Sequence, residues 1–175
     1  MQNMKRIITI QHPQSIHHTN KMIGSWTDWD LSEKGIKQAE AIANNLYEEL
    51  SGETIIIYSS DLLRTKHTAQ IIGKRFDLTP IYKFELRERN LGKCCGKSVE
   101  WLKANIEKQE ITIDDKCFSD AESRRDAYNR LKPFFEEIIH GSDQNIIIVS
   151  HGDLLVLFNT LFLNLDVEVI NQFEL

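Results

Sequence analysis

Short apolar runs alternate with longer amphipathic segments along the chain, and this alternation predicts the fold. Continuous runs rich in β-branched residues indicate strands at residues 6–11, 54–58 and 145–150, with a shorter one at 81–83 that Pro80 can begin. Apolar positions at helical spacing predict helices over residues 32–50, 61–76, 98–107, 123–140 and 153–163. Strands that alternate with helices build a parallel sheet covered on both faces. We therefore expect an α/β fold, a three-layer α/β/α sandwich with a mainly parallel sheet, formed by residues 1–175 as one domain.

Two polar connections interrupt this pattern, at residues 85–98 and between the third predicted helix (98–107) and Ala121. Loops of this length in a compact domain are usually functional or partly mobile, so they are candidates for substrate recognition. The end of the chain, Val167 to Leu175, is compatible with a last strand at the edge of the sheet.

Composition and charge narrow the class of protein. The chain has 41% hydrophobic and 27% charged residues and a net charge of −5, which is typical of a soluble globular protein and argues against a nucleic-acid or anionic-membrane surface. Met1 is not followed by a secretory signal pattern, and the longest apolar run, Leu154 to Leu165, is too short to span a bilayer. Three cysteines in no disulfide or zinc spacing indicate reduced thiols. We expect a cytoplasmic protein that concentrates any phosphate chemistry in one cleft.

Reactive side chains follow three of the predicted strands. His12 comes directly after the first strand, His151 after the last long one, and Arg64 lies in the first turn of the helix after the second. Because the carboxyl ends of parallel strands share one edge of a sheet, these three side chains can converge there. The free N–H groups at a helix start and the planar, charged guanidinium of an arginine can both bind a phosphate. Taken alone, each of these residues is as typical of a structural or surface role as of a functional site. The prediction of a site therefore depends on their joint placement.

Two histidines and an arginine at one edge suit phosphoryl transfer through a histidine. A neutral imidazole nitrogen attacks phosphorus, fixed donors hold the equatorial oxygens, and an acid protonates the leaving oxygen. Glu85 and Glu88, in the first polar connection, are candidates for that acid, although solvated loop charge is the more usual role of a glutamate.

Six segments match, in order, the motifs of a known family: Ile8–His12, Gly24 with Asp30–Ala39, Tyr58–Thr65 with Thr68–Ala69, Leu86–Glu88 with Gly92 and Gly96, Glu122–Ser123, and Val149–Gly152. On these motifs the chain resembles branch 1 of the histidine phosphatase superfamily, the phosphoglycerate mutase-like proteins. The resemblance implies that His12 is the phosphorylated nucleophile, Arg64 a phosphate clamp, Glu88 the proton donor and His151 the second histidine at the phosphoryl group. It also implies a substrate site at four further residues, Gln11, Ser15, Gly24 and Gly152. It implies no metal and no organic cofactor, and as partner a small phosphate ester or inorganic phosphate.

The first motif departs from the family pattern of arginine, histidine and glycine, because this chain reads Gln11-His12-Pro13. Gln11 carries no charge, and Pro13 has no backbone N–H to donate. Removing one transition-state donor typically costs about 100- to 1,000-fold in rate. We therefore hypothesise a weakened clamp, with slow turnover or an unusual substrate, unless Arg87 or Arg89 supplies the missing charge.

Other candidates are weaker. The side chains of His17 and His18 should diverge, which favours a solvated loop over a metal site. Cys94 and Cys95 lack an activating partner and are expected to be ordinary thiols. Trp26 can wall a substrate pocket or serve packing.

The function favoured by the sequence is phosphomonoester hydrolysis through a phosphohistidine at His12. The alternative is a phosphate-binding or protein-interaction module that kept the scaffold, favoured by Gln11 and Pro13. A phosphoglycerate mutase is less favoured, because mutases of this family are usually longer. Neither the substrate nor the oligomeric state follows from the sequence.

Overall fold

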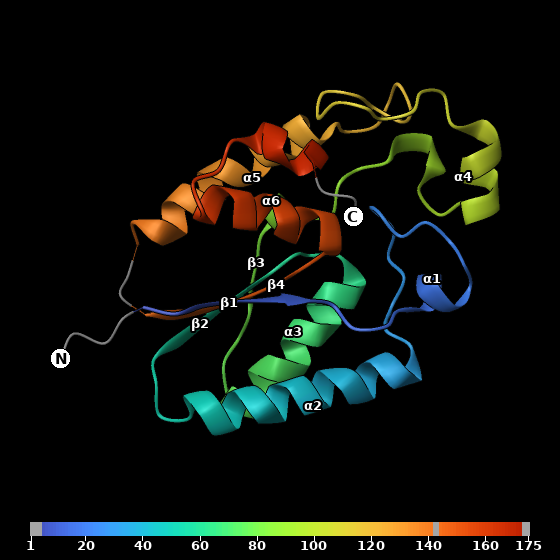
Figure 1. Ribbon diagram of the computed structural model, residues 1–175. Helices are drawn as coiled ribbons and strands as arrows, with labels where there is room; N and C mark the ends of the chain where they lie inside the picture. Colours follow the sequence, from blue (N-terminus) through green and yellow to red (C-terminus); the bar gives the residue numbers. More distant parts are fainter. Residues whose placement is uncertain (1–4, 142–143, 173–175) are drawn as a thin grey trace.

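A four-stranded sheet lies at the centre of the computed structural model, which describes residues 5–141 and 144–172 (Figure 1). The strands are β1 (Ile7–Gln11), β2 (Ile55–Ser59), β3 (Ile81–Tyr82) and β4 (Asn145–Ser150). Their order is β1-β4-β2-β3, and every neighbouring pair is parallel. All four carboxyl ends therefore point to one edge of the sheet.

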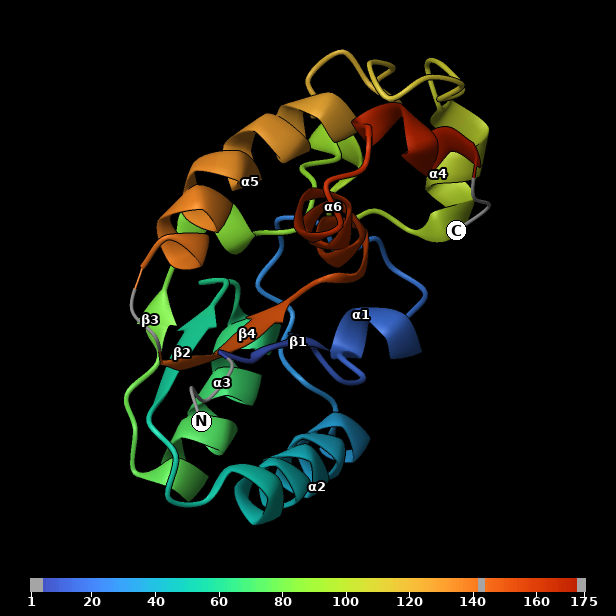
Figure 2. The same ribbon diagram turned by 60° about the vertical axis from the view of Figure 1, so that its left-hand side comes forward.

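Four helices cover the two faces of the sheet. The helices of the described residues are α1 (Ile16–Thr19), α2 (Glu33–Leu50), α3 (Leu63–Phe76), α4 (Val99–Asn105), α5 (Arg124–Ile139) and α6 (Gly152–Phe162), with 3-10 turns η1 (Phe84–Leu86), η2 (Gly92–Cys94) and η3 (Val167–Gln172). Helices α2 and α3 lie against one face, and α5 and α6 against the other (Figures 1 and 2). Helices α1 and α4 lie beyond the carboxyl ends of the strands. The expected three-layer α/β/α sandwich is confirmed.

The central strand β4 is apolar throughout because both of its faces are buried. Ile146 and Ile148 pack with α5 and α6 in one core, whereas Ile147 and Val149 pack with α2 and α3 in the other. Side chains alternate between the faces of a strand, so a strand covered on both sides needs apolar residues at every position. This is why residues 145–150 read as a continuous run in the sequence.

Serines set the starts of three helices. The hydroxyl of Ser32 accepts a hydrogen bond from Gly35 N at the start of α2, and Ser98 and Ser123 cap α4 and α5 in the same way. Such caps satisfy backbone donors that a helix start leaves free. The helix boundaries predicted from the sequence agree with these caps to within about two residues.

The expectation of a last strand is wrong for the described part of the segment 167–175. Residues 167–172 form the 3-10 turn η3, and Phe173 to Leu175 lie outside the described residues. Asp166 starts the turn by accepting hydrogen bonds from Glu168 N and Val169 N, and Val167 and Ile170 are buried three residues apart. That spacing places both side chains on one side of a helical turn, whereas in a strand two residues three apart point to opposite faces. Among the described residues, no helix is long and apolar enough to cross a membrane.

We predict that the two-sided core around β4 dominates stability. Replacing Ile148, which is fully buried, with alanine should lower the free energy of unfolding by about 2–5 kcal/mol, because it removes apolar contacts and leaves a cavity. Urea denaturation monitored by circular dichroism measures the change. The matched control is Ile111→Ala at a 75% exposed position, which should change stability by less than about 0.5 kcal/mol. Equal effects of the two substitutions would contradict the assignment of the core.

Candidate active site

The register of the sheet brings the two strand-end histidines together. Gln11 of β1 pairs with Ser150 of β4, so the residues that follow them, His12 and His151, leave the sheet side by side. Their ring centroids are 5.2 Å apart, and His12 N donates to Ser150 O at 3.0 Å. The two imidazoles come from opposite ends of the sequence, and only the parallel pairing of β1 with β4 makes them neighbours.

The hydrogen bonds of His12 define its tautomer. Nδ1 lies 2.8 Å from Pro13 O, an acceptor, so Nδ1–H is the donor and Nε2 keeps its lone pair. That lone pair accepts a hydrogen bond from Arg64 Nε at 3.0 Å. Burial, helped by the Arg64 charge, lowers the pKa of His12 to about 3. His12 is therefore a neutral imidazole near pH 7, the form in which it is a nucleophile.

Arg64 is a buried cation whose hydrogen bonds, among the described residues, go to neutral acceptors. Its side chain donates to Thr27 O at 2.9 Å and Ser25 O at 2.8 Å, besides its bond to His12. Within residues 5–141 and 144–172, no carboxylate lies within ion-pair distance of its guanidinium. Burial lowers the pKa of Arg64 to about 10, which still leaves it charged at neutral pH. A buried charge held only by neutral groups favours binding an anion beside it.

Glu88 lies in the loop after η1, and its carboxylate contacts the first turn of α6. Its Oε1 accepts hydrogen bonds from Arg89 N at 2.9 Å and from Leu154 N at 3.2 Å. Burial first, and the neighbouring Asp153 carboxylate second, raise the pKa of Glu88 to about 7. A carboxyl group with such a pKa can both give and take a proton near neutral pH.

His151 is fully buried and has one free ring nitrogen. Its Nε2 lies 3.0 Å from Ser60 Oγ, whereas Nδ1 has no hydrogen-bond partner among the described residues. Burial, followed by the Arg64 charge, lowers its pKa well below the usual value, so the ring is neutral. A buried polar atom without a partner is rare, and here it lies on the ring next to His12.

The four residues expected at the substrate site differ in their placement. Gln11 is exposed and lies next to Gly152, where a Cβ added to the glycine would come 3.4 Å from Gln11 Nε2. Ser15 is fully buried, and its hydroxyl contacts His17 Nδ1 at 2.6 Å. Gly24 lies against the same imidazole, since a Cβ there would come 2.7 Å from His17 Nε2. Ser15 and Gly24 thus support His17, while Gln11 and Gly152 lie beside the strand ends.

The expectation that His17 and His18 diverge is wrong. Their ring centroids are 4.0 Å apart, and they lie 5.9 Å and 5.6 Å from that of His12. Both belong to α1, a short helix that the apolar pattern does not reveal. Ser15 caps it, and His18, three residues later, accepts a hydrogen bond from Ser15 N, which completes a capping box. The usual sequence signature of this box has Glu or Gln at the third position, so a histidine there hides the helix from the sequence. Among the described residues, no group of three or more histidine, cysteine or acidic side chains is placed to hold a metal ion.

The two arginines beside Glu88 are already paired. Arg87 makes a bidentate ion pair with Asp61, with contacts of 2.6 Å and 2.7 Å. Arg89 is buried and binds Glu110 through both Nη atoms. In this arrangement neither guanidinium replaces the charge that Gln11 lacks. The thiol of Cys94 is buried, and burial raises its pKa to about 12, which fits an unreactive thiol.

Comparison with known families identifies the superfamily. The profile of the histidine phosphatase superfamily (branch 1) matches residues 7–175. The chain belongs to this superfamily. Phosphatases among its relatives support an enzyme of the phosphatase type.

Relatives of this histidine phosphatase carry two kinds of activity. A glucosyl-3-phosphoglycerate phosphatase from Mycolicibacterium vanbaalenii is 28% identical and aligns over 94% of this chain and 77% of its own. A 2,3-bisphosphoglycerate-dependent phosphoglycerate mutase from Methanococcus vannielii is 26% identical, over 87% and 78%. The solved structure of a mycobacterial glucosyl-3-phosphoglycerate phosphatase superposes with a TM-score of 0.83 at 26% identity, covering 97% of this chain and 84% of that one. The same mycobacterial protein has been solved with inorganic phosphate.

We predict that Glu88 makes stability fall as pH rises through neutrality. Its pKa is raised on folding, so its protonated form favours the folded state below about pH 4.5, and this contribution is lost as pH rises through about 7. Glu88→Gln keeps an oxygen acceptor but cannot ionise. The free energy of unfolding of Glu88→Gln minus that of the parent should increase by about 1–3 kcal/mol between pH 5 and pH 8, measured by urea denaturation.

Asp153→Asn is the matched variant for this titration. Removing the neighbouring carboxylate should lower the pKa of Glu88 and shift the fall in stability to lower pH, because one cause of the raised pKa is gone. Parallel pH profiles for the parent and Glu88→Gln would show that Glu88 titrates normally.

Proposed function

We propose that this histidine phosphatase hydrolyses a small phosphate monoester through a phosphohistidine at His12. The observation that carries the proposal is the pair formed by His12 and Arg64, a neutral nucleophile in contact with a buried cation that has no carboxylate partner among the described residues. An incoming phosphate fits this pair on both counts, since it is an electrophile for the imidazole and a counter-ion for the guanidinium.

In the first step, the phosphoryl oxygens take over hydrogen bonds from Arg64, and this frees the lone pair on His12 Nε2. That lone pair forms the N–P bond while the bond from phosphorus to the leaving oxygen breaks. Glu88, protonated in part near neutral pH, gives its proton to the leaving oxygen. The free Nδ1 of His151 is the further donor available to the phosphoryl oxygens.

In the second step, the Glu88 carboxylate takes a proton from water as the water oxygen attacks phosphorus. The N–P bond breaks, its electron pair returns to His12 Nε2, and inorganic phosphate leaves. The bond from Nδ1–H to Pro13 O holds the ring in one orientation through both steps, and it needs only the carbonyl of Pro13. The proline therefore costs the site a backbone donor and leaves the nucleophile in position.

A second candidate function is a phosphate-binding or protein-interaction module without turnover. It is favoured by the neutral Gln11, by the missing N–H of Pro13 and by the pairing of Arg87 and Arg89 with carboxylates. These features lower the positive charge at the phosphate, while His12, Arg64, Glu88 and His151 together favour the enzyme. Hydrolysis and its dependence on His12 decide between the two.

We predict that His12→Ala abolishes hydrolysis of a generic aryl phosphate near pH 6. At that pH His12 is neutral, because its pKa is about 3, and Glu88 is mostly protonated, because its pKa is about 7. The rate, followed by release of the phenol, should fall by roughly 1,000-fold or more when the nucleophile is removed. His140→Ala, at the end of α5, is the control for loss of a histidine and should keep the parent rate. Equal background rates in the parent and His12→Ala would favour the binding module.

We also predict that a cation at position 11 raises the rate. Gln11 is exposed and lies beside Gly152, so an arginine can be accommodated there and bring a charge to the strand ends. Gln11→Arg, particularly with Pro13→Gly, should increase kcat/KM for the aryl phosphate by about 10- to 100-fold through added transition-state donors. Gln70→Arg adds the same charge at an exposed position of α3 and should have little effect. No gain from Gln11→Arg in a folded protein would mean that another residue already fills this role.

A further inference from the structure

Arg89 lies between two carboxylates that compete for its guanidinium. Glu110 holds the Nη side, where both Nη atoms donate to its two carboxylate oxygens. Asp153 faces the other side, with Oδ2 3.5 Å from Nε, and this buried Nε makes no hydrogen bond among the described residues. Buried N–H groups are nearly always hydrogen-bonded, so the free Nε marks the weaker of the two contacts. Glu110 therefore holds the guanidinium, and Asp153 keeps only a long contact to it.

Asp153 connects this ion pair with the proposed acid. It lies in the first turn of α6, next to Leu154, whose backbone N donates to Glu88 Oε1 at 3.2 Å. Arg89 N donates to the same oxygen at 2.9 Å. The Asp153 carboxylate thus faces the Arg89 guanidinium and also acts on Glu88, where its charge is, after burial, the second cause of the raised pKa. Any change in how strongly Arg89 pairs with Asp153 is therefore felt at Glu88.

The other charges that face Glu88 leave Asp153 in a special position. Charged groups reach Glu88 from three helices and from its own loop: Arg64 of α3, Arg130 of α5, Asp153 of α6 and Arg89. Arg130 donates to Glu88 O, and its charge is taken up by a bidentate contact with Glu122. Arg64 favours the ionised form of Glu88. Asp153 acts against Arg64 and favours the protonated form.

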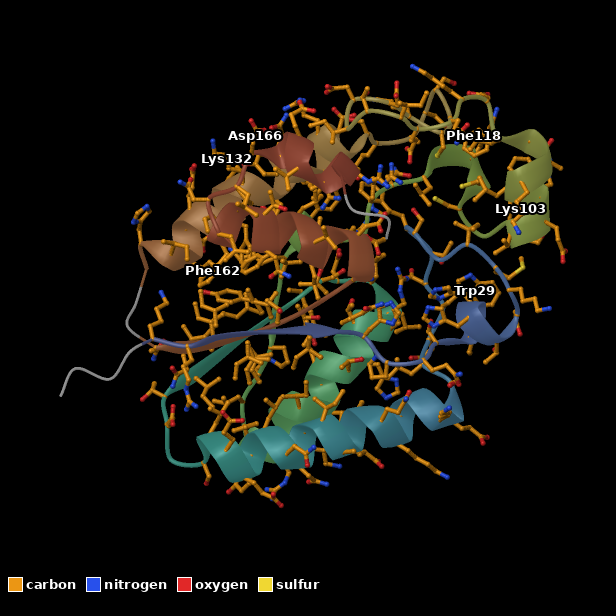
Figure 3. The ribbon with its side chains drawn as sticks, viewed as in Figure 1. Trp29, Lys103, Phe118, Lys132, Phe162 and Asp166 are labelled. Atoms are coloured by element: carbon orange, nitrogen blue, oxygen red, sulfur yellow. The ribbon has the colours of Figure 1, made fainter. Side chains whose placement is uncertain are left out.

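Glu110 is held in place by the connection between α4 and α5, residues 106–123. Its Oε1 also accepts a hydrogen bond from Cys117 N at 3.2 Å, and its side chain is mostly buried. Cys117 belongs to a small buried cluster with Phe118, which lies beside Trp101 of α4 (Figure 3). The carboxylate thus contacts the guanidinium from a segment that is anchored apart from the strand ends.

We propose that Glu110 is a positioning residue for the general acid. By holding the guanidinium of Arg89 away from Asp153, it leaves the Asp153 charge free to keep the proton on Glu88. The inference rests on the proposed role of Glu88 as proton donor in hydrolysis, and it adds a residue that acts on this donor through two others. Without the Glu110 charge, Arg89 pairs with Asp153 and cancels its effect, so Glu88 loses its proton at lower pH.

The pH dependence of kcat/KM for phenyl phosphate tests the proposal, because the leaving oxygen takes its proton from Glu88 in the first step. This rate should fall with rising pH as Glu88 ionises. In Glu110→Gln the fall should move to lower pH by about one unit, because Arg89 then neutralises Asp153. In an Asp153→Asn background, Glu110→Gln should cause no further shift, since the residue through which it acts is gone.

Glu107→Gln is the matched control. It removes a carboxylate from the same connection between α4 and α5, but one that pairs with Lys93 instead of Arg89. The pH profile of this variant should coincide with that of the parent. An unshifted profile in folded Glu110→Gln, or an equal shift in the Asp153→Asn background, would overturn the proposal.

A second comparison does not need Glu110→Gln to fold. Arg89→Gln/Glu110→Gln removes both charges of the buried pair together, which is better tolerated than leaving one of them unpaired. Asp153→Asn should shift the profile equally in the parent and in this double variant, because Arg89 does not neutralise Asp153 in either. A much larger shift in the double variant would show that Arg89 already neutralises Asp153 in the parent, and would reject the proposal.

Lack of hydrolysis by the parent would reject the proposed function, and the ionisation of Glu88 would then be followed by stability. The difference in unfolding free energy between Glu88→Gln and the protein with Glu88 is measured against pH, with and without Glu110→Gln. A transition at lower pH in the presence of Glu110→Gln would support the positioning role, and an unchanged transition would reject it.

Discussion

The buried guanidinium of Arg64 is the constraint on which the site depends. Its side chain is buried, and no carboxylate of the described residues makes an ion pair with it, so the loop carbonyls of Ser25 and Thr27 and the ring of His12 hold it instead. Three neutral acceptors orient the cation without cancelling its field. A charge kept in this way is ready for an anion, and no reorganisation is needed when the anion arrives.

Burial, with this charge added to it, sets the protonation states of the histidines around Arg64. The charge lies close to four imidazoles, and together with burial it keeps His12, His17, His18 and His151 neutral. Glu88 is shifted in the opposite sense by burial and by Asp153, so that its proton is exchangeable near pH 7. Neutral imidazoles beside a partly protonated carboxyl group form the combination that a nucleophile and a general acid require.

Gln11 and Pro13 reduce the number of donors at this site without disturbing its frame. The contacts that place His12 use its own backbone, the carbonyl of Pro13 and Arg64, and none of them requires an arginine at position 11 or an N–H at position 13. Around this frame, α1 adds the two histidines His17 and His18, whose rings lie close to that of His12.

The sequence by itself determined the layers of the fold and the strand ends that carry His12, Arg64 and His151. A strand buried on both faces needs a continuous run of apolar residues, and a helix buried on one face needs an apolar stripe. Both patterns can be read from neighbouring positions in the sequence. The tertiary structure alone decided which partners these residues have. The pairing of Arg87 with Asp61 and of Arg89 with Glu110 joins residues far apart in the chain, and no local pattern records it. It also decided the shape of short segments such as α1 and η3, where a few hydrogen bonds to nearby serine and aspartate outweigh a weak apolar pattern.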